Sequence, residues 1–190
     1  MGVKKVLIVM GSPRKDGNST ILAERVAQGA TDAKAIVESF YLHKMNIKPC
    51  TACDVCRKDT TLDCNINDDM QDLYPKLRQT NALVIASPIY YFTVAAQVKL
   101  FMDRCYALGG PQGNALKGKR IGIIVTYGGS DPFDSGAVNA LRTFQDAFAY
   151  IGSYIIDMVY GSADKAGEIR TNIELMEKAY LMGGQLVADT

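Results

Sequence analysis

The sequence contains no tryptophan and only one histidine, His43, among its 190 residues. No neighbouring residue pattern points to a histidine-based catalytic site, so we interpret His43 as a surface residue. Charge of one sign is not in excess either, because 21 basic and 20 acidic residues leave a net charge of +1. Since the basic residues are scattered, the sequence predicts a solvated surface rather than a nucleic-acid partner.

Long apolar runs are also missing. The run that follows the basic start of the chain covers only residues 6–10, which is shorter than the apolar core of a signal peptide. No stretch approaches the ~18 apolar residues of a membrane helix, so we expect no membrane association and a cytoplasmic location. In that compartment, clustered cysteines bind metal or react more often than they form structural disulfides.

Three common functional motifs are absent as well. The chain has neither the G-x-x-x-x-G-K-[ST] loop of nucleoside triphosphatases nor the G-x-G-x-x-G fingerprint of dinucleotide-binding folds. It also lacks the G-x-S-x-G motif of many hydrolases. Hydrolase chemistry therefore has no support in this sequence.

Short apolar runs alternate with amphipathic stretches along the chain. This alternation is typical of βαβ units and of a parallel sheet with helices on both faces. A length of 190 residues fits one domain, which we place at 1–190, with a cysteine-rich insertion loop at 43–68. The pattern predicts a flavodoxin-like, doubly wound α/β fold with a five-stranded parallel sheet of order 2-1-3-4-5. The predicted strands are 6–10, 35–42, 82–86, 120–126 and 154–160, and the predicted helices are 19–30, 69–79, 95–106, 135–150 and 165–187, the last interrupted at 183–184.

The loop after the first predicted strand, residues 11–20, has the composition of an anion site. The unpaired N–H groups and the dipole at a helix N-terminus favour a bound phosphate. Gly11 and Gly17 allow the backbone to close around a small group. Further donors come from the side chains of Ser12, Asn18, Ser19 and Thr20. Plain helix capping by these polar residues is the alternative.

Two stretches carry a family resemblance: GSPRKDGNST at 11–20 and SPIYYFTVAAQVKLFMDR at 87–104. Together they resemble the NAD(P)H-dependent FMN reductase family of flavodoxin-like proteins, and the resemblance covers most of residues 3–160. It implies that the first loop wraps the phosphate of FMN and that NAD(P)H is the co-substrate. The residues that the resemblance assigns to the phosphate are Ser12, Arg14, Asn18, Ser19 and Thr20.

The ends of the third and fourth predicted strands supply candidates for contact with the flavin ring. A flat amphipathic ring favours apolar or aromatic contact on its face and backbone groups along its edge. The resemblance places two groups there: Pro88, Ile89, Tyr90, Tyr91 and Phe92 after the third strand, and Thr126, Tyr127, Gly128 and Gly129 after the fourth. We expect Pro88 to fix a turn. Core or dimer packing is the alternative for the aromatic residues, and a plain β-turn is the alternative for the glycines.

Four of the five cysteines lie in the 43–68 loop with the spacing C-x2-C-x2-C-x7-C. The compact part of this run resembles the motif that holds an iron–sulfur cluster in bacterial ferredoxins, and within the FMN reductase group the iron–sulfur flavoproteins resemble this sequence most. The candidate ligands of a [4Fe–4S] cluster are Cys50, Cys53, Cys56 and Cys64, the last at the long end of the usual spacing. A structural zinc site and free thiols are the alternatives. The fifth cysteine, Cys105, is interpreted as a core residue.

Four aspartates lie close to the start of the helix predicted at 69–79: Asp63, Asp68, Asp69 and Asp72. They suggest either a cation site or favourable charge at a helix N-terminus. We prefer the second interpretation, because carboxylates near a helix start interact favourably with the helix dipole.

Two functions of different classes follow. The first is an FMN-dependent oxidoreductase that uses NAD(P)H to reduce a quinone, a free flavin or another small acceptor. The alternative is an iron–sulfur flavoprotein that accepts electrons from a ferredoxin and carries them to FMN; a redox sensor built on the cysteine loop is a third, weaker reading. We assign no catalytic side chain, since the cofactor performs the chemistry. The resemblance also implies a homodimer or a homotetramer.

Overall fold

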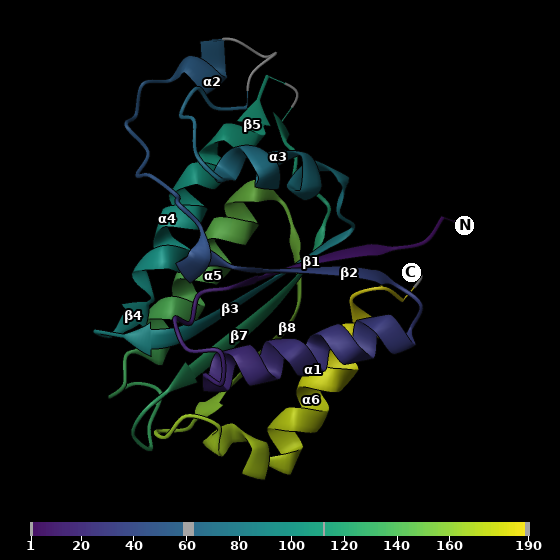
Figure 1. The fold of residues 1–190 in the computed structure, drawn as a ribbon, viewed down its shortest axis with the longest axis vertical. Helices are drawn as coiled ribbons and strands as arrows, with labels where there is room; N and C mark the ends of the chain where they lie inside the picture. The colour runs from purple at the N-terminus through teal and green to yellow at the C-terminus, as the bar shows by residue number, and fades with distance from the viewer. Residues whose placement is uncertain (1, 59–62, 112, 189–190) are drawn as a thin grey trace.

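The computed structural model describes residues 2–58, 63–111 and 113–188 (Figure 1). Its main sheet confirms the predicted fold, with five parallel strands in the order β2-β1-β3-β7-β8. These strands are β1 (Lys5–Met10), β2 (Ile36–Tyr41), β3 (Ala82–Tyr90), β7 (Arg120–Tyr127) and β8 (Tyr154–Ser162). The short strand β4 (Thr93–Val94) pairs antiparallel with β3, while β5 (Gly109–Gly110) and β6 (Gly113–Asn114) form a separate small hairpin.

Helices cover both faces of the sheet, as predicted (Figure 1). On one face lie α1 (Asn18–Asp32) and α6 (Ile173–Gln185), which pack on Val6 and Ile8 of β1. On the other face lie α3 (Met70–Gln79), α4 (Ala96–Arg104) and α5 (Ala137–Ile151), which enclose Leu7 and Val9. The central strands are apolar on both sides because neither side meets water.

The last predicted helix, 165–187, is wrong in two respects. The structure divides it into a 3₁₀ turn at Glu168–Thr171 and α6, and Asn172 caps α6 by accepting a 3.1 Å hydrogen bond from the Leu175 N–H. The predicted interruption at 183–184 does not occur, because both glycines lie inside α6. Gly183 is needed for packing, since a Cβ there would lie 2.3 Å from the carbonyl oxygen of Val26 on α1.

The expected turn at Pro88 is also wrong. Strand β3 continues through Pro88, which pairs with Thr126 of β7, and ends at Tyr90. The chain turns instead at Tyr91 and Phe92, which both adopt left-handed φ values, of 50° and 67°. Such a pair between antiparallel strands is a type I′ hairpin turn, and it places two aromatic side chains in a conformation that favours glycine and asparagine.

None of the helices in the described residues has both the length and the apolar character needed to span a bilayer. The short helix α2 (Val55–Lys58) lies in the cysteine-rich loop, away from the sheet (Figure 1). The predicted insertion at 43–68 includes residues 59–62, which lie outside the described residues. His43 is exposed, and Cys105 is buried in the core, as predicted.

Candidate functional site

A pocket lies where the carboxyl ends of β1, β3 and β7 meet. This position is where doubly wound sheets bind their ligands. Nine of the residues predicted for the cofactor line it: Ser12, Arg14, Asn18, Pro88, Ile89, Tyr90, Thr126, Tyr127 and Gly128. Three separate predicted segments therefore come together around one cavity.

Five predicted residues do not line this pocket. Ser19 and Thr20 are buried in the first turn of α1, while Tyr91, Phe92 and Gly129 are exposed at the tips of their loops. Besides Gly17 of the first loop, three lining residues were not predicted as contacts: Ala163, Asp164 and Ala166, all in the loop after β8. The rule that ligands gather at the carboxyl ends of parallel strands would have drawn attention to this fourth loop as well.

Most polar side chains of the first loop hold the loop itself in place. The Ser12 hydroxyl donates to the Arg14 carbonyl at 3.2 Å, and the Thr20 hydroxyl donates to the same oxygen at 3.3 Å. Gly17 leaves room for this arrangement, since a Cβ there would lie 2.3 Å from Ser12 Oγ. Gly17 and Asn18, at the start of α1, consequently line the pocket as part of a fixed loop.

The side chain of Asn18 joins the first loop to the loop after β8. Its amide donates to the carbonyls of Ala163 and Lys165, at 3.1 and 2.9 Å, and its oxygen accepts from the Ile169 N–H at 3.2 Å. Both amide hydrogens are thus committed to carbonyl oxygens. Any contact of Asn18 with a phosphate is left to its backbone N–H.

Ser19 differs from these neighbours. Its Oγ is buried and has no hydrogen-bond partner within the described residues. A buried hydroxyl without a partner costs free energy, and here it lies in the first turn of α1, which carries no acidic residue. Ser19 does not line the pocket, but Arg14 and Asn18, the first residue of α1, do. The positive helix end and the arginine fit the phosphate of FMN.

The rest of the pocket fits a flat ring and its polar edge. Tyr90 and Tyr127 offer aromatic surface, and burial raises the pKa of the Tyr127 phenol, so that it stays a neutral hydrogen-bond donor. The loop after β8 approaches Gly128, because a Cβ added to Gly128 would lie 3.5 Å from Asp164 Oδ1. Glu168 holds this loop by accepting from the N–H groups of Asp164 and Lys165, which lower the pKa of its carboxyl.

A second, smaller pocket lies beside the cysteine-rich loop. All four candidate ligands line it: Cys50, Cys53, Cys56 and Cys64. Within the described residues, no three Cys, His, Asp or Glu side chains are grouped so that they could hold one metal ion, so the arrangement gives no support to a zinc site. In a four-iron cluster each thiolate binds a different iron, which spreads the sulfurs further apart. Four cysteines that line one pocket supply the kind of donor that iron–sulfur clusters use.

The thiols of this pocket differ in exposure. Cys50 and Cys53 are exposed, and hydrogen bonds from Val55 and Thr51 lower the pKa of Cys53. Cys56 and Cys64 are partly buried, and burial raises the pKa of the Cys56 thiol. Two non-glycine residues next to Cys53, Ala52 and Asp54, have positive φ values of 52° and 56°.

The interpretation of the four aspartates as charge at a helix start holds for three of them and is wrong for Asp63, since Asp69 is the N-cap residue of α3 and Asp68 accepts from the N–H of its first residue, Met70. Helix α3 begins at Met70, and only Asp72 lies in its first turn. Asp63 pairs with Arg78, and Asp69 accepts a 2.7 Å hydrogen bond from the Asn46 N–H. These contacts tie the cysteine-rich loop to the body of the protein.

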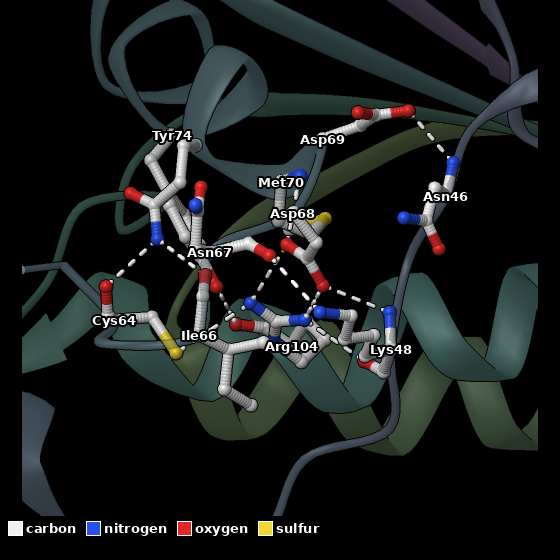
Figure 2. A network of polar contacts seen from close by, with 11 residues as sticks. Asn46, Lys48, Cys64, Ile66, Asn67, Asp68, Asp69, Met70, Tyr74 and Arg104 are labelled. Atoms are coloured by element: carbon white, nitrogen blue, oxygen red, sulfur yellow. Dashed lines mark hydrogen bonds and ion pairs between the residues drawn. The ribbon is translucent and has the colours of Figure 1, made fainter.

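The fourth aspartate, Asp68, forms a fully buried ion pair with Arg104 at the end of α4 (Figure 2). Burial alone would raise the pKa of Asp68, but hydrogen bonds from Arg104 and from the N–H groups of Lys48 and Met70 outweigh it and lower that pKa. The sequence analysis missed this pair. A charged residue on the apolar stripe of the helix predicted at 95–106 was the available signal, since arginine is almost never buried unless paired.

The strand order and the position of the pocket are those of a flavodoxin-like α/β protein. The family model of NADPH-dependent FMN reductases matches residues 4–168, and the chain belongs to that family.

Similar proteins are found in archaea and bacteria. An iron–sulfur flavoprotein of Methanosarcina thermophila is 31% identical over 152 residues, which are 80% of this chain and 76% of that protein. A Bacillus subtilis protein named as an NAD(P)H-dependent FMN-containing oxidoreductase is 27% identical over 179 residues, 92% of this chain and 94% of that one. The chain spans only 55%, 60% and 51% of the length of three further archaeal iron–sulfur flavoproteins that it matches.

Solved structures agree on the fold. An NAD(P)H:quinone oxidoreductase from Methanothermobacter marburgensis superposes with a TM-score of 0.77 over 100% of both chains, at 14% identity. Identity this low shows a common architecture and nothing about substrate.

Proposed function

We propose that this protein is an FMN-dependent oxidoreductase that takes electrons from NAD(P)H and passes them to a small acceptor such as a quinone or a free flavin. The observation that carries the proposal is the pocket at the carboxyl ends of β1, β3 and β7, where Arg14 and the first residue of α1 lie opposite Tyr90 and Tyr127. A phosphate is the ligand chemistry that satisfies this arrangement. Family membership points in the same direction.

The residues of the chain bind and orient in this proposal. FMN, when bound, supplies a ring that accepts hydride and releases electrons. The first loop holds the anionic end, Tyr90 and Tyr127 contact the ring, and the backbone near Gly128 meets the ring edge. No side chain has to move a proton for hydride transfer, which agrees with the lack of an assigned catalytic residue.

The test is direct. The purified protein should bind FMN, seen as flavin absorbance that stays with the chain through gel filtration, and NADH or NADPH should bleach that absorbance under anaerobic conditions. A protein that leaves its pocket empty in excess FMN would contradict the proposal. Retention of riboflavin as tightly as FMN would contradict the phosphate assignment.

A second candidate is an electron carrier that takes electrons from a ferredoxin through an iron–sulfur cluster. The observation in its favour is that four cysteine side chains line one pocket, and several similar proteins carry the name iron–sulfur flavoprotein. Anaerobic reduction separates the two candidates. Bleaching of the flavin by a reduced nicotinamide supports the reductase, whereas bleaching only by a reduced ferredoxin supports the carrier.

We also propose that residues 1–190 act as one domain that carries the cysteine-rich loop, works in the cytoplasm and assembles as a homodimer or homotetramer. The exposed aromatic pair Tyr91 and Phe92, which are 96% and 58% exposed, supports an assembly, because exposed apolar patches mark interaction surfaces. Sedimentation of the purified protein tests the assembly.

A further inference from the structure

One buried guanidinium, that of Arg104, contacts both ends of the cysteine-rich loop (Figure 2). Its Nη1 donates to the Lys48 carbonyl at 2.8 Å, two residues before Cys50. Its Nη2 lies 3.5 Å from Cys64 Sγ and 3.2 Å from Asp68 Oδ1. The side chain is only 1% exposed, so these contacts are made away from water.

Asp68 fixes the direction in which this guanidinium points. Its two oxygens accept from the N–H groups of Lys48, at 2.8 Å, and Met70, at 3.1 Å, while also pairing with Arg104. Gln71 adds a second anchor, since its Nε2 donates to the carbonyls of Cys64 and Ile66, both at 2.7 Å. Both the backbone and the sulfur of Cys64 are therefore held by the body of the protein.

The other candidate ligands lack such an anchor among the described residues. Cys50 and Cys53 are exposed, and the polar contacts found for Cys53, with Thr51, Val55 and Asn65, all lie within the same loop. Cys64 also stands furthest along the sequence from its neighbours in the motif. Because the short spacing of the motif does not fix the position of Cys64, other residues have to position it.

Arg104 also links the two pockets. It is the last residue of α4, a helix whose start is held by a 2.9 Å hydrogen bond from the Ala95 N–H to Ser87 Oγ, directly before Pro88 in the flavin pocket. A nine-residue helix spans roughly 14 Å. Holding Cys64 at the far end of α4 fixes the cysteine pocket relative to the flavin pocket.

We propose that Arg104, oriented by Asp68, is the positioning residue for Cys64 as the fourth ligand of an iron–sulfur cluster. The proposal rests on the cluster-bearing candidate function. Hydrogen bonds to ligand sulfurs are a recognised means by which proteins tune such clusters, and partners of this kind affect metal affinity about 10–100-fold. An isolated buried ion pair contributes little net stability. A role in positioning is therefore a better explanation for these two buried charges than a role in stability.

The experiment compares full-length variants in which a cluster is assembled anaerobically from ferrous iron and sulfide. Arg104→Lys keeps the charge but cannot bond Asp68, the Lys48 carbonyl and Cys64 together. Asp68→Asn/Arg104→Met removes both buried charges at once, so that neither is left unpaired. Cys64→Ser is the reference for a missing fourth ligand. Arg78→Met is the matched control, because the Arg78–Asp63 pair also ties down the loop without touching a sulfur.

A cube that has lost its fourth cysteine releases one iron on oxidation and leaves a three-iron cluster with its own EPR signal. With limiting ferricyanide as the oxidant, the wild type and Arg78→Met should keep four irons. Both Arg104 variants and Cys64→Ser should show the three-iron signal and lose iron to a chelator about 10-fold faster or more. FMN content should be unchanged throughout.

The Arg104 variants behaving like the wild type would overturn the proposal, as would a four-iron cluster that survives in Cys64→Ser. If the double variant does not fold, Arg104→Lys decides by the same EPR signal. A wild type that binds FMN but assembles no cluster overturns this proposal and the carrier function, and leaves the flavin-dependent reductase standing.

Discussion

The buried Ser19 hydroxyl has no hydrogen-bond partner among the described residues, and in the proposed function it donates to the phosphate of FMN. Replacing Ser19 with aspartate puts a carboxylate there, and repulsion between the two anions should abolish FMN binding. Ser19→Ala removes one hydrogen bond to a charged group, worth about 1.5–3 kcal/mol, so the Kd for FMN should rise roughly 10-fold or more. Quenching of flavin fluorescence measures both. Riboflavin, which lacks the phosphate, is the control, and an equal loss of riboflavin binding in Ser19→Ala would argue against the assignment.

Asp68 gives the protein a predictable sensitivity to acid. Its pKa is lowered in the folded state, chiefly because hydrogen bonds from Arg104 and two backbone N–H groups outweigh burial. The stabilisation is therefore complete above the unfolded value of about 3.9 and is lost as the pH falls through the folded pKa. Asp68→Asn leaves Arg104 buried and unpaired, and should lower the free energy of unfolding at pH 7 by about 3–5 kcal/mol.

Urea unfolding at pH 7 and at several values between pH 5 and 3 measures this effect. The wild type should lose stability across that interval more steeply than Asp68→Asn. Asp63→Asn, in the partly exposed pair with Arg78, should cost only about 1 kcal/mol or less. If Asp68→Asn and Asp63→Asn lose the same free energy of unfolding, the buried ion pair contributes no more to stability than the partly exposed one.

Side-chain chemistry was predictable from the sequence only where one residue acts alone. Polar residues after the first strand pointed to the pocket, yet the amide of Asn18 turned out to be occupied by the carbonyls of Ala163 and Lys165. The partner of Arg104 lies 36 positions away in the chain. Neither contact leaves a local pattern, because both depend on how distant segments meet.

The two glycines of helix α6, Gly183 and Gly184, have different surroundings, and this difference can be tested. A Cβ at Gly183 would lie 2.3 Å from Val26 O and 2.6 Å from Ala30 N on α1, whereas a Cβ at Gly184 would meet nothing within 4 Å. Gly183→Ala should destabilise the protein by about 1–3 kcal/mol through overpacking. Gly184→Ala should stabilise it by roughly 0.5–1 kcal/mol, because alanine is the better helix former. Thermal unfolding followed by circular dichroism measures both, and a destabilising Gly184→Ala would contradict the account.

Elements were predicted well where an apolar run ends in a clear turn, as at β1 and β7. They were predicted poorly where tertiary contacts override local preference. Glycines inside α6 look like a helix end in sequence, but close packing on α1 keeps the helix intact. The turn at Tyr91 and Phe92 carries no glycine or asparagine, so nothing in its composition indicated a hairpin.

At the scale of the whole molecule, the strand order followed from the alternation of strands and helices, since right-handed crossovers leave few arrangements. The meeting of three loops at one pocket followed from that order. The fourth loop, around Asp164, and the position of the cysteine pocket at the far end of α4 did not follow. Both are set by long connections whose paths local sequence does not determine.

The hairpin at Tyr91 and Phe92 bears on assembly. Left-handed conformations at non-glycine residues cost roughly 1–2 kcal/mol each, and here the surroundings hold them. Gly136 packs against the backbone of Phe92, where a Cβ would lie 2.5 Å from Phe92 Cα, and Asn139 Nδ2 donates to the Phe92 carbonyl at 3.1 Å. Backbone strain that the surroundings maintain at exposed aromatic residues indicates that those side chains contact another molecule.

The double variant Tyr91→Asn/Phe92→Gly places the preferred residues of a type I′ turn at this hairpin. If Tyr91 and Phe92 contact a second copy of the chain, sedimentation should show a shift from multiples of 20.7 kDa towards the single chain. The monomeric variant should unfold at a higher temperature than wild-type protein that has been diluted until it is monomeric, because the turn in the variant is no longer strained. An unchanged assembly would place the interface elsewhere. A loss of FMN without dissociation would instead favour a role for the two aromatic residues at the flavin.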